Sequence, residues 1–110
     1  MLRRIIWNVG QIMARKSKTM HPGRILREEY MEPFHLDANG LAAALGVQAW
    51  RLEPIIADRE PVTSDLALRL AKCFRTSPQF WLGLQTAYDL GQAEAMYGAE
   101  IDSQVHALAA

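Results

Sequence analysis

The sequence predicts an all-α protein with a single domain, and three observations support this interpretation. Apolar residues recur at spacings of three and four along most of the chain, which is the pattern of helices with one buried face. No segment shows the sustained alternation of apolar and polar residues that is typical of strands. The length of 110 residues suits one domain with one core.

The first helix is predicted to begin at Pro22 and to run to the next proline, Pro33. Proline is favoured at the first position of a helix, because the amide hydrogen that it lacks would have no partner there. The side chains expected to face the core are Ile25, Leu26, Tyr30 and Met31.

A second, shorter helix is predicted to follow Asp37, whose carboxylate can accept hydrogen bonds from the free amides of the first turn. Its buried stripe is expected to consist of Leu41, Ala42 and Leu45. Gly46 suits the left-handed conformation that ends a helix, and a third helix is predicted directly after it. The segment from Leu36 to Asp58 therefore has the layout of a helix-turn-helix.

The third helix has an inner side and an outer side. Its inner residues are expected to be Val47, Leu52, Ile55 and Ile56. Its outer or edge residues, which a partner would meet, are Gln48, Ala49, Trp50, Arg51 and Glu53. Pro54 conflicts with a regular helix, since a proline in a helix interior removes a hydrogen bond and costs about 3 kcal/mol. We therefore expect a late start, a kink or a 3₁₀ turn between Arg51 and Pro54.

Thr63 is predicted to cap a fourth helix, with Leu66, Leu70 and Phe74 in the core and Ala67 and Ala71 beside them. Ser77 and Pro78 then open a last long helix that is expected to reach Tyr97. Its main apolar stripe is Phe80, Trp81, Leu84, Ala87 and Tyr88. Leu82, Leu90 and Ala93 lie off that stripe, which favours a second contact made by self-association. After Gly98 the chain is expected either to form a short sixth helix or to fray.

Charge is distributed unevenly along a chain whose formal net charge is zero. Residues 1–27 hold seven lysines and arginines and no acid, residues 28–75 hold five bases and eight acids, and residues 76–110 hold four acids and neither lysine nor arginine. A basic arm is suited to phosphate and an acidic tail to a basic protein. The alternative is that the leader is merely solvated.

The residue inventory does not favour catalysis, a cofactor or a metal. His21, His35 and His106 lie far apart, and the sequence has no HExxH motif, cysteine pair or phosphate-binding glycine loop. The single Cys73 is expected to be a small buried hydrophobe, and the lack of a disulfide partner indicates a cytoplasmic protein. No apolar run approaches the roughly 20 residues that cross a bilayer, and polar residues in the leader argue against a signal peptide.

Three stretches carry a family resemblance: MHPGRILREEYMEP from Met20, LAAALGV, and PVTSDLALRLAKCFRTSPQFWLGLQTAYDL. Together they resemble the HigA/VapI group of antitoxins, within the lambda-repressor-like helix-turn-helix superfamily. The resemblance covers about residues 20–92 and implies a domain of five helices, or six, over residues 20–93. Residues 1–19 would be a basic extension and residues 94–110 an acidic tail or short helix.

The resemblance also implies a function. Such antitoxins dimerise through their C-terminal part, bind a palindromic operator in double-stranded DNA of their own promoter, and neutralise a HigB-like toxin, a RelE-like enzyme that cleaves mRNA. The second motif helix would lie in the major groove, and a dimer would read two half-sites about 34 Å apart. The groove-facing residues would be Gln48, Ala49, Trp50, Arg51 and Glu53, with phosphate contacts near Ala38, Asn39 and Arg59.

Several residues depart from the family pattern. Ala38 and Gly40 replace polar and acidic residues, Pro54 replaces a helix-compatible residue, and Asp58 stands where a glycine normally ends the helix. The alternatives are a degenerate helix-turn-helix that acts only as a toxin-binding or protein-interaction module, and a solitary repressor. Arg51 is the best candidate for a guanine or phosphate contact, or else it pairs with Asp58 or Glu53. Trp50 is expected either at the core edge or in contact with a thymine methyl or a protein.

Overall fold

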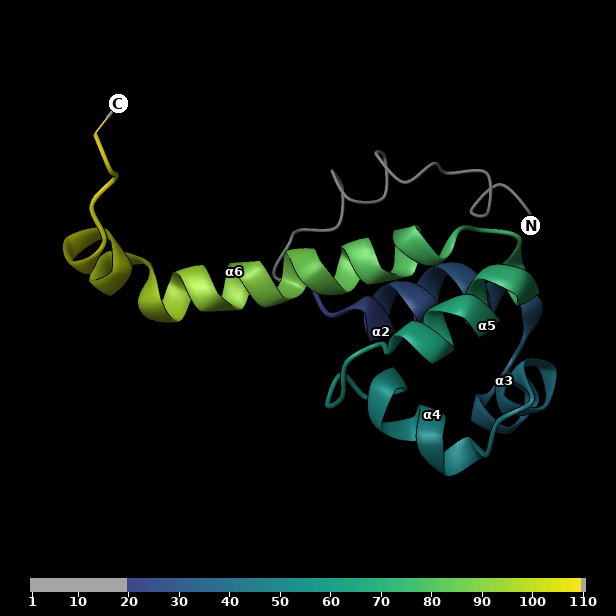
Figure 1. Cartoon of the computed structure of the whole chain (residues 1–110). Helices are drawn as coiled ribbons and strands as arrows, with labels where there is room; N and C mark the ends of the chain where they lie inside the picture. Colours follow the sequence, from purple (N-terminus) through teal and green to yellow (C-terminus); the bar gives the residue numbers. More distant parts are fainter. Residues whose placement is uncertain (1–19, 110) are drawn as a thin grey trace.

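The computed structural model of the chain describes residues 20–109, so the predicted extension 1–19 lies outside the described residues. Every regular element within this range is helical, which confirms the all-α prediction. Within residues 20–109 there are five helical segments, as expected (Figure 1). Their elements are α2 (Pro22–Ile25), η2 (Leu26–Met31) and η3 (Glu32–Phe34), which form one segment, then α3 (Ala38–Leu45), α4 (Ala49–Ile56), α5 (Ser64–Phe74) and α6 (Pro78–Gln104).

The first helical segment begins at Pro22 as predicted, but most of it is not an α-helix. Residues 26–31 form a π-helix, and the amide of Glu32 donates to the carbonyl of Arg27 five residues earlier. A 3₁₀ turn containing Pro33 follows, and His35 ends it in the left-handed conformation with φ of 56°. The spacing of apolar residues in the sequence did not predict the π-helix. The four expected core side chains are nevertheless all buried.

The first helix of the predicted motif, α3, forms as expected. The Asp37 carboxylate accepts a hydrogen bond from the amide of Gly40 at 2.7 Å, and Gly46 ends the helix with φ of 71°. Only glycine adopts such a φ without strain, so the turn between α3 and α4 depends on it. The expected core residues of α3 are Leu41, Ala42 and Leu45, and all three are buried.

The expectation of a late start or a 3₁₀ turn in α4 is wrong. The helix begins at Ala49 and remains α-helical through Ile56, with Pro54 inside it. Pro54 is half-buried and lines a surface hollow together with the exposed Trp50 and the buried Leu52. The Trp50 carbonyl loses its usual amide partner, and we infer that water in this hollow can hydrate it.

The core is closed by α5 and α6. Thr63 and Ser77 cap these helices as predicted, accepting hydrogen bonds from the amides of Leu66 and Phe80. Trp81 is fully buried, stacks 5.0 Å from Tyr30, and donates from Nε1 to the Thr76 hydroxyl at 2.8 Å. The large aromatic core therefore joins the first helical segment to the last.

Two details of these helices differ from expectation. α6 continues without a break through Gly98 to Gln104, so neither a separate short helix nor fraying follows Gly98. One glycine costs a helix only about 1 kcal/mol, and the alanines around it favour the helix. Cys73 is exposed, whereas the sequence predicted burial. It lies on the last turn of α5 beside a hollow lined by Ala44 and Leu45, where α3 does not cover it.

The molecule is elongated, with dimensions of 52 × 29 × 19 Å. Figure 1 shows why: α6 runs along one side and extends well beyond the other helices, while α3 and α4 lie on the far side. No described helix combines the length and the apolar character that a bilayer crossing requires.

Candidate nucleic-acid interface

The C-terminal end of α4 is attached to the first helical segment. Asp58 takes the left-handed conformation with φ of 65°, at the position where a glycine would be free of strain. Arg27 donates to the carbonyl of Ile56 and, at 2.9 Å, to the Asp58 carboxylate. These bonds satisfy a carbonyl that the end of the helix leaves free, and they fix the direction of α4.

The outer side of α4 carries most of the residues predicted to meet DNA. Trp50 is 69% exposed, which excludes the alternative that it lies at the core edge. Arg51 and Glu53 are exposed as well. Gln48 is the exposed N-cap residue, and its side chain makes no capping bond in the described structure, which leaves its amide available. Ala49 is half-buried and packs partly against the core, so it lies at the edge of this surface.

Arg51 makes an ion pair, but not with the expected partners. Its Nη2 lies 3.4 Å from Oδ2 of Asp65 at the start of α5, whereas Asp58 pairs with Arg27. The same Asp65 oxygen accepts a hydrogen bond from Nε of Arg69 at 3.0 Å. The hydrogen bond from Arg69, with the positive charges of both arginines, lowers the pKa of Asp65, so its carboxylate is ionised at neutral pH.

Arg69 links this ion-pair network to the turn of the helix-turn-helix. Its Nη1 donates to the carbonyl of Leu45 at 2.9 Å and to that of Gly46 at 3.3 Å. These carbonyls end α3 and are therefore acceptors without a partner in their own helix. One arginine thus connects the end of α3 with the carboxylate that holds Arg51.

The phosphate contacts predicted near Ala38, Asn39 and Arg59 flank α4 in the chain, and Ala38 is half-buried. Asn39 is exposed in the first turn of α3, and Arg59 is exposed one residue after the left-handed Asp58. Both side chains are thus open to solvent. They lie on either side of the recognition surface in the sequence, and the predicted roles of both remain predictions.

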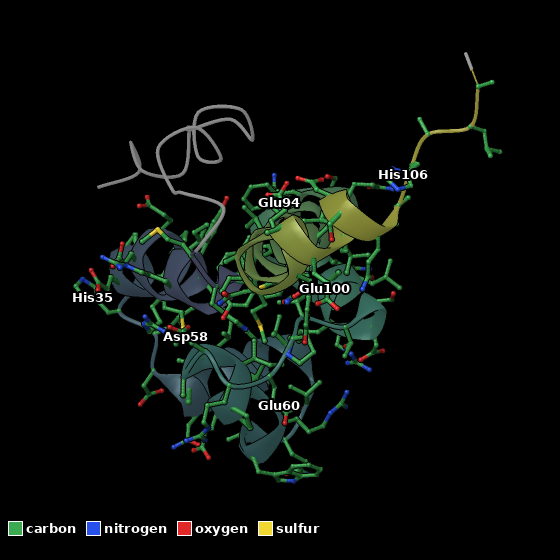
Figure 2. The ribbon with its side chains drawn as sticks, turned by 90° about the vertical axis from the view of Figure 1, so that its left-hand side faces the viewer. His35, Asp58, Glu60, Glu94, Glu100 and His106 are labelled. Atoms are coloured by element: carbon green, nitrogen blue, oxygen red, sulfur yellow. The ribbon has the colours of Figure 1, made fainter. Side chains whose placement is uncertain are left out.

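The described part of this surface has no excess of positive charge. Arg51 and Arg59 stand beside the exposed acids Glu53 and Glu60, and Asp65 already pairs with Arg51. Figure 2 shows Glu60 on the α4 side of the molecule and Glu94 and Glu100 on α6. Attraction to phosphate would depend strongly on the basic residues 1–19, which lie outside the described residues.

Sequence reasoning missed Asp65 and Arg69, which it treated only as parts of the fourth helix. Their spacing of four on one helix could have suggested their mutual ion pair. Their contacts with Arg51, Leu45 and Gly46 arise only when α5 packs against α3 and α4. In residues 20–109, no group of three or more histidine, cysteine or acidic residues is placed to hold a metal ion.

The proposed self-association surface lies on α6. Leu90 is 59% exposed, Ala93 is half-exposed, and Leu82 is half-buried and packs partly against the core. At about 100° of rotation per residue, Leu90 lies about 120° around α6 from Leu84, which faces the core. Further exposed apolar residues follow toward the end of the chain: Met96, Tyr97, Ile101, Val105 and Leu108.

The chain is similar in sequence and structure to known antitoxins and to a virulence-associated protein. No family model matches the chain. It is 49% identical over 75 residues to virulence-associated protein I of Dichelobacter nodosus, covering 68% of this chain and 69% of the relative. A solved structure of antitoxin HigA of Pseudomonas aeruginosa with the higBA promoter is 37% identical, with a TM-score of 0.79 over 83% of this chain and 99% of that one. Antitoxin GraA in complex with its operator is 47% identical, with a TM-score of 0.78 over 83% of this chain and 92% of that one.

Proposed function

The chain belongs to the HigA/VapI group of helix-turn-helix antitoxins, and on that premise we propose that it is a dimeric DNA-binding repressor of its own promoter that also neutralises a RelE-like, mRNA-cleaving toxin. The observation that carries the DNA-binding part is the outer side of α4, where Trp50 and Arg51 are exposed. Relatives of the same fold were solved with promoter or operator DNA, which supports this assignment. The protein is proposed to act in the cytoplasm without a cofactor.

In the proposed complex, α4 lies in the major groove. Arg51 is the residue best suited to recognise a base, because only its Nη2 is engaged and the other guanidinium donors can address guanine bidentately. Gln48 can pair with adenine, Trp50 can contact a thymine methyl, and Glu53 can accept from cytosine. The partly buried Ala49 adds at most a methyl contact.

Phosphate contacts would position the protein without reading sequence. Asn39 and Arg59 are the proposed contributors, because both are exposed and the family pattern assigns phosphate contacts near them. The five lysines and arginines in residues 1–19 would add the main long-range attraction.

Dimerisation would place two copies of α4 on the two halves of a palindrome. A twofold dimer reads half-sites about 34 Å apart, one turn of the duplex. Leu90 would supply most of the contact between copies, because it is 59% exposed, with smaller parts from Ala93 and Leu82, which are half-buried. Residues 76–110 hold four acids and neither lysine nor arginine. This negative charge supports the proposed neutralisation of a basic toxin.

A second candidate function is a protein-interaction module that neutralises a toxin without reading DNA. The observation in its favour is the acidic surroundings of Arg51, where Glu53 and Glu60 are exposed and Asp65 occupies part of the guanidinium. A solitary repressor would differ from the main proposal only in having no toxin beside its gene.

A reporter assay in cells separates these functions. The DNA upstream of the gene drives a reporter, the protein is supplied in trans, and the product of the neighbouring reading frame is expressed separately. An autorepressing antitoxin lowers reporter output, loses this effect in Arg51→Ala, and relieves growth arrest by the neighbour. Relief of growth arrest without repression would favour the interaction module, and repression with no toxic neighbour would favour the solitary repressor.

A further inference from the structure

We propose that Asp65 is a positioning residue that raises the sequence selectivity of DNA binding by holding Arg51 in place on the outer side of α4. This inference rests on the proposed function, because selectivity has a meaning only if α4 reads DNA. It concerns a residue on α5, outside the helix-turn-helix itself, and it assigns that residue a role through Arg51 alone.

The geometry places one carboxylate oxygen between two guanidinium groups. Oδ2 of Asp65 lies 3.4 Å from Nη2 of Arg51 and 3.0 Å from Nε of Arg69. All three side chains are partly exposed, with 52% of the Asp65 side chain, 44% of Arg51 and 39% of Arg69 in contact with solvent. Arg51 therefore meets its partner at the surface where DNA would approach.

Asp65 is itself held in place by Arg69, which bonds to the end of α3. The Arg69 guanidinium has two backbone acceptors, the carbonyls of Leu45 and Gly46. These contacts fix the guanidinium to the turn that precedes α4. Through Arg69, Asp65 is therefore held at a fixed position relative to the turn after which α4 begins.

Holding Arg51 has a direct consequence for recognition. A free arginine has several rotatable bonds, and ordering it on binding costs side-chain entropy. It can also swing to the nearest phosphate, which yields affinity without selectivity. The ion pair with Asp65 restricts the rotation of Arg51 and its movement toward a phosphate. The guanidinium donors that Asp65 does not engage remain available for a base. The negative charge of Asp65 also opposes the phosphates, so it lowers affinity for every sequence.

The test compares Asp65→Asn with Glu60→Gln. Both variants remove one negative charge beside α4, but only the first touches Arg51, since Glu60 has no part in the Asp65 network. Fluorescence anisotropy measures Kd for the full chain on a duplex from its own upstream region and on a scrambled duplex. Both variants are expected to bind the scrambled duplex about two- to threefold more tightly. Only Asp65→Asn is expected to lower the preference for the operator, by about two- to fivefold.

A double-mutant cycle shows whether Asp65 acts through Arg51. In an Arg51→Ala background, Asp65→Asn is expected to leave the remaining operator preference unchanged. A merely structural role for Asp65, as an acid in the first turn of α5, would lower the preference equally in both backgrounds. The melting temperature of Asp65→Asn is expected to lie slightly below that of Glu60→Gln, because Arg69 and Arg51 lower the pKa of Asp65 and its ionised carboxylate therefore stabilises the fold.

The outcomes separate this inference from the proposed function. If the wild-type protein has no operator preference, the DNA-reading function fails and this role for Asp65 fails with it. If the wild type is selective but Asp65→Asn keeps the preference of Glu60→Gln, the positioning role alone is overturned. A loss of preference that persists in the Arg51→Ala background would also overturn it.

Discussion

The guanidinium of Arg27 lies 2.9 Å from the carboxylate of Asp58 and joins the first helical segment to the end of α4. Asp58 occupies a left-handed position in which a side chain is strained, and the same Arg27 nitrogen also donates to the Ile56 carbonyl. An aspartate can thus replace the usual glycine here because its carboxylate gains a partner across the interface. The orientation of the recognition helix depends on this pair.

Loss of this arginine is expected to destabilise the fold. Arg27→Met should lower the free energy of unfolding by about 1–2 kcal/mol, because a helix-terminal carbonyl and a partly exposed carboxylate lose their donor. Urea denaturation measures the change. The control is Arg24→Met, which removes the i,i+4 ion pair of the more exposed Arg24 with Glu28 and should cost no more than about 0.5 kcal/mol. Equal effects in the two variants would show that the attachment to α4 contributes little.

Gly23 is expected not to tolerate a methyl group. A Cβ at this position would overlap the carbonyl oxygen of Ile55 and approach Oδ1 of Asp58 to 2.6 Å. Gly23→Ala should therefore cost about 1–3 kcal/mol, because backbone must move. Gly83→Ala is the matched control, since its Cβ meets nothing within 4 Å and alanine should stabilise the helix by about 0.5–1 kcal/mol. Thermal melts that show the same sign for both would contradict the close approach of α2 and α4.

Stability is expected to depend on Tyr30 at alkaline pH. Burial, with a smaller effect of the nearby Glu29 charge, raises the pKa of Tyr30 to about 12 from its usual 10.0. The pKa of Tyr30 is higher in the folded than in the unfolded state. The stability that the protonated Tyr30 provides is therefore fully present below pH 10 and is lost as the pH rises toward 12. The loss should reach about 2–3 kcal/mol. Urea unfolding of Tyr30→Phe across this range should lack that component, and identical profiles would contradict it.

A charge on the outer side of α6 is expected to separate the dimer. Leu90→Glu places a carboxylate in the proposed contact between copies and should convert the dimer to a monomer in sedimentation equilibrium. Leu68→Glu is the control, because Leu68 is equally exposed, at 60% against 59%, but lies on α5. A Leu90→Glu protein that remains dimeric would exclude this part of α6 as the interface.

Local signals in the sequence predicted most of the fold. The caps Asp37, Thr63 and Ser77 and the turn at Gly46 lie where expected, because each involves only neighbouring residues. The π-helix of the first segment was not predicted, since an apolar pattern does not distinguish hydrogen bonds over four residues from those over five. The late start or 3₁₀ turn predicted from Pro54 does not occur, since α4 is α-helical from Ala49 through Ile56.

The candidate site was predicted only in part. The exposed positions of Trp50, Arg51 and Glu53 follow from helical periodicity around Leu52, which is fully buried. Periodicity does not predict that Asp65 is the partner of Arg51, because Asp65 lies 14 residues away and reaches Arg51 only through the packing of α5. Exposure of Cys73 has the same origin, since whether an edge residue is covered depends on where the neighbouring helix ends.

Recognition of DNA by α4 through Arg51 can be tested by a binding experiment on two duplexes. Fluorescence anisotropy on the upstream duplex and a scrambled duplex, at two salt concentrations, gives the operator preference of the wild type and of Arg51→Ala. The wild type is expected to prefer the operator by about 10³-fold or more, and Arg51→Ala to reduce that preference by about ten- to hundredfold. Equal, weak binding to both duplexes that disappears with added salt would contradict this recognition.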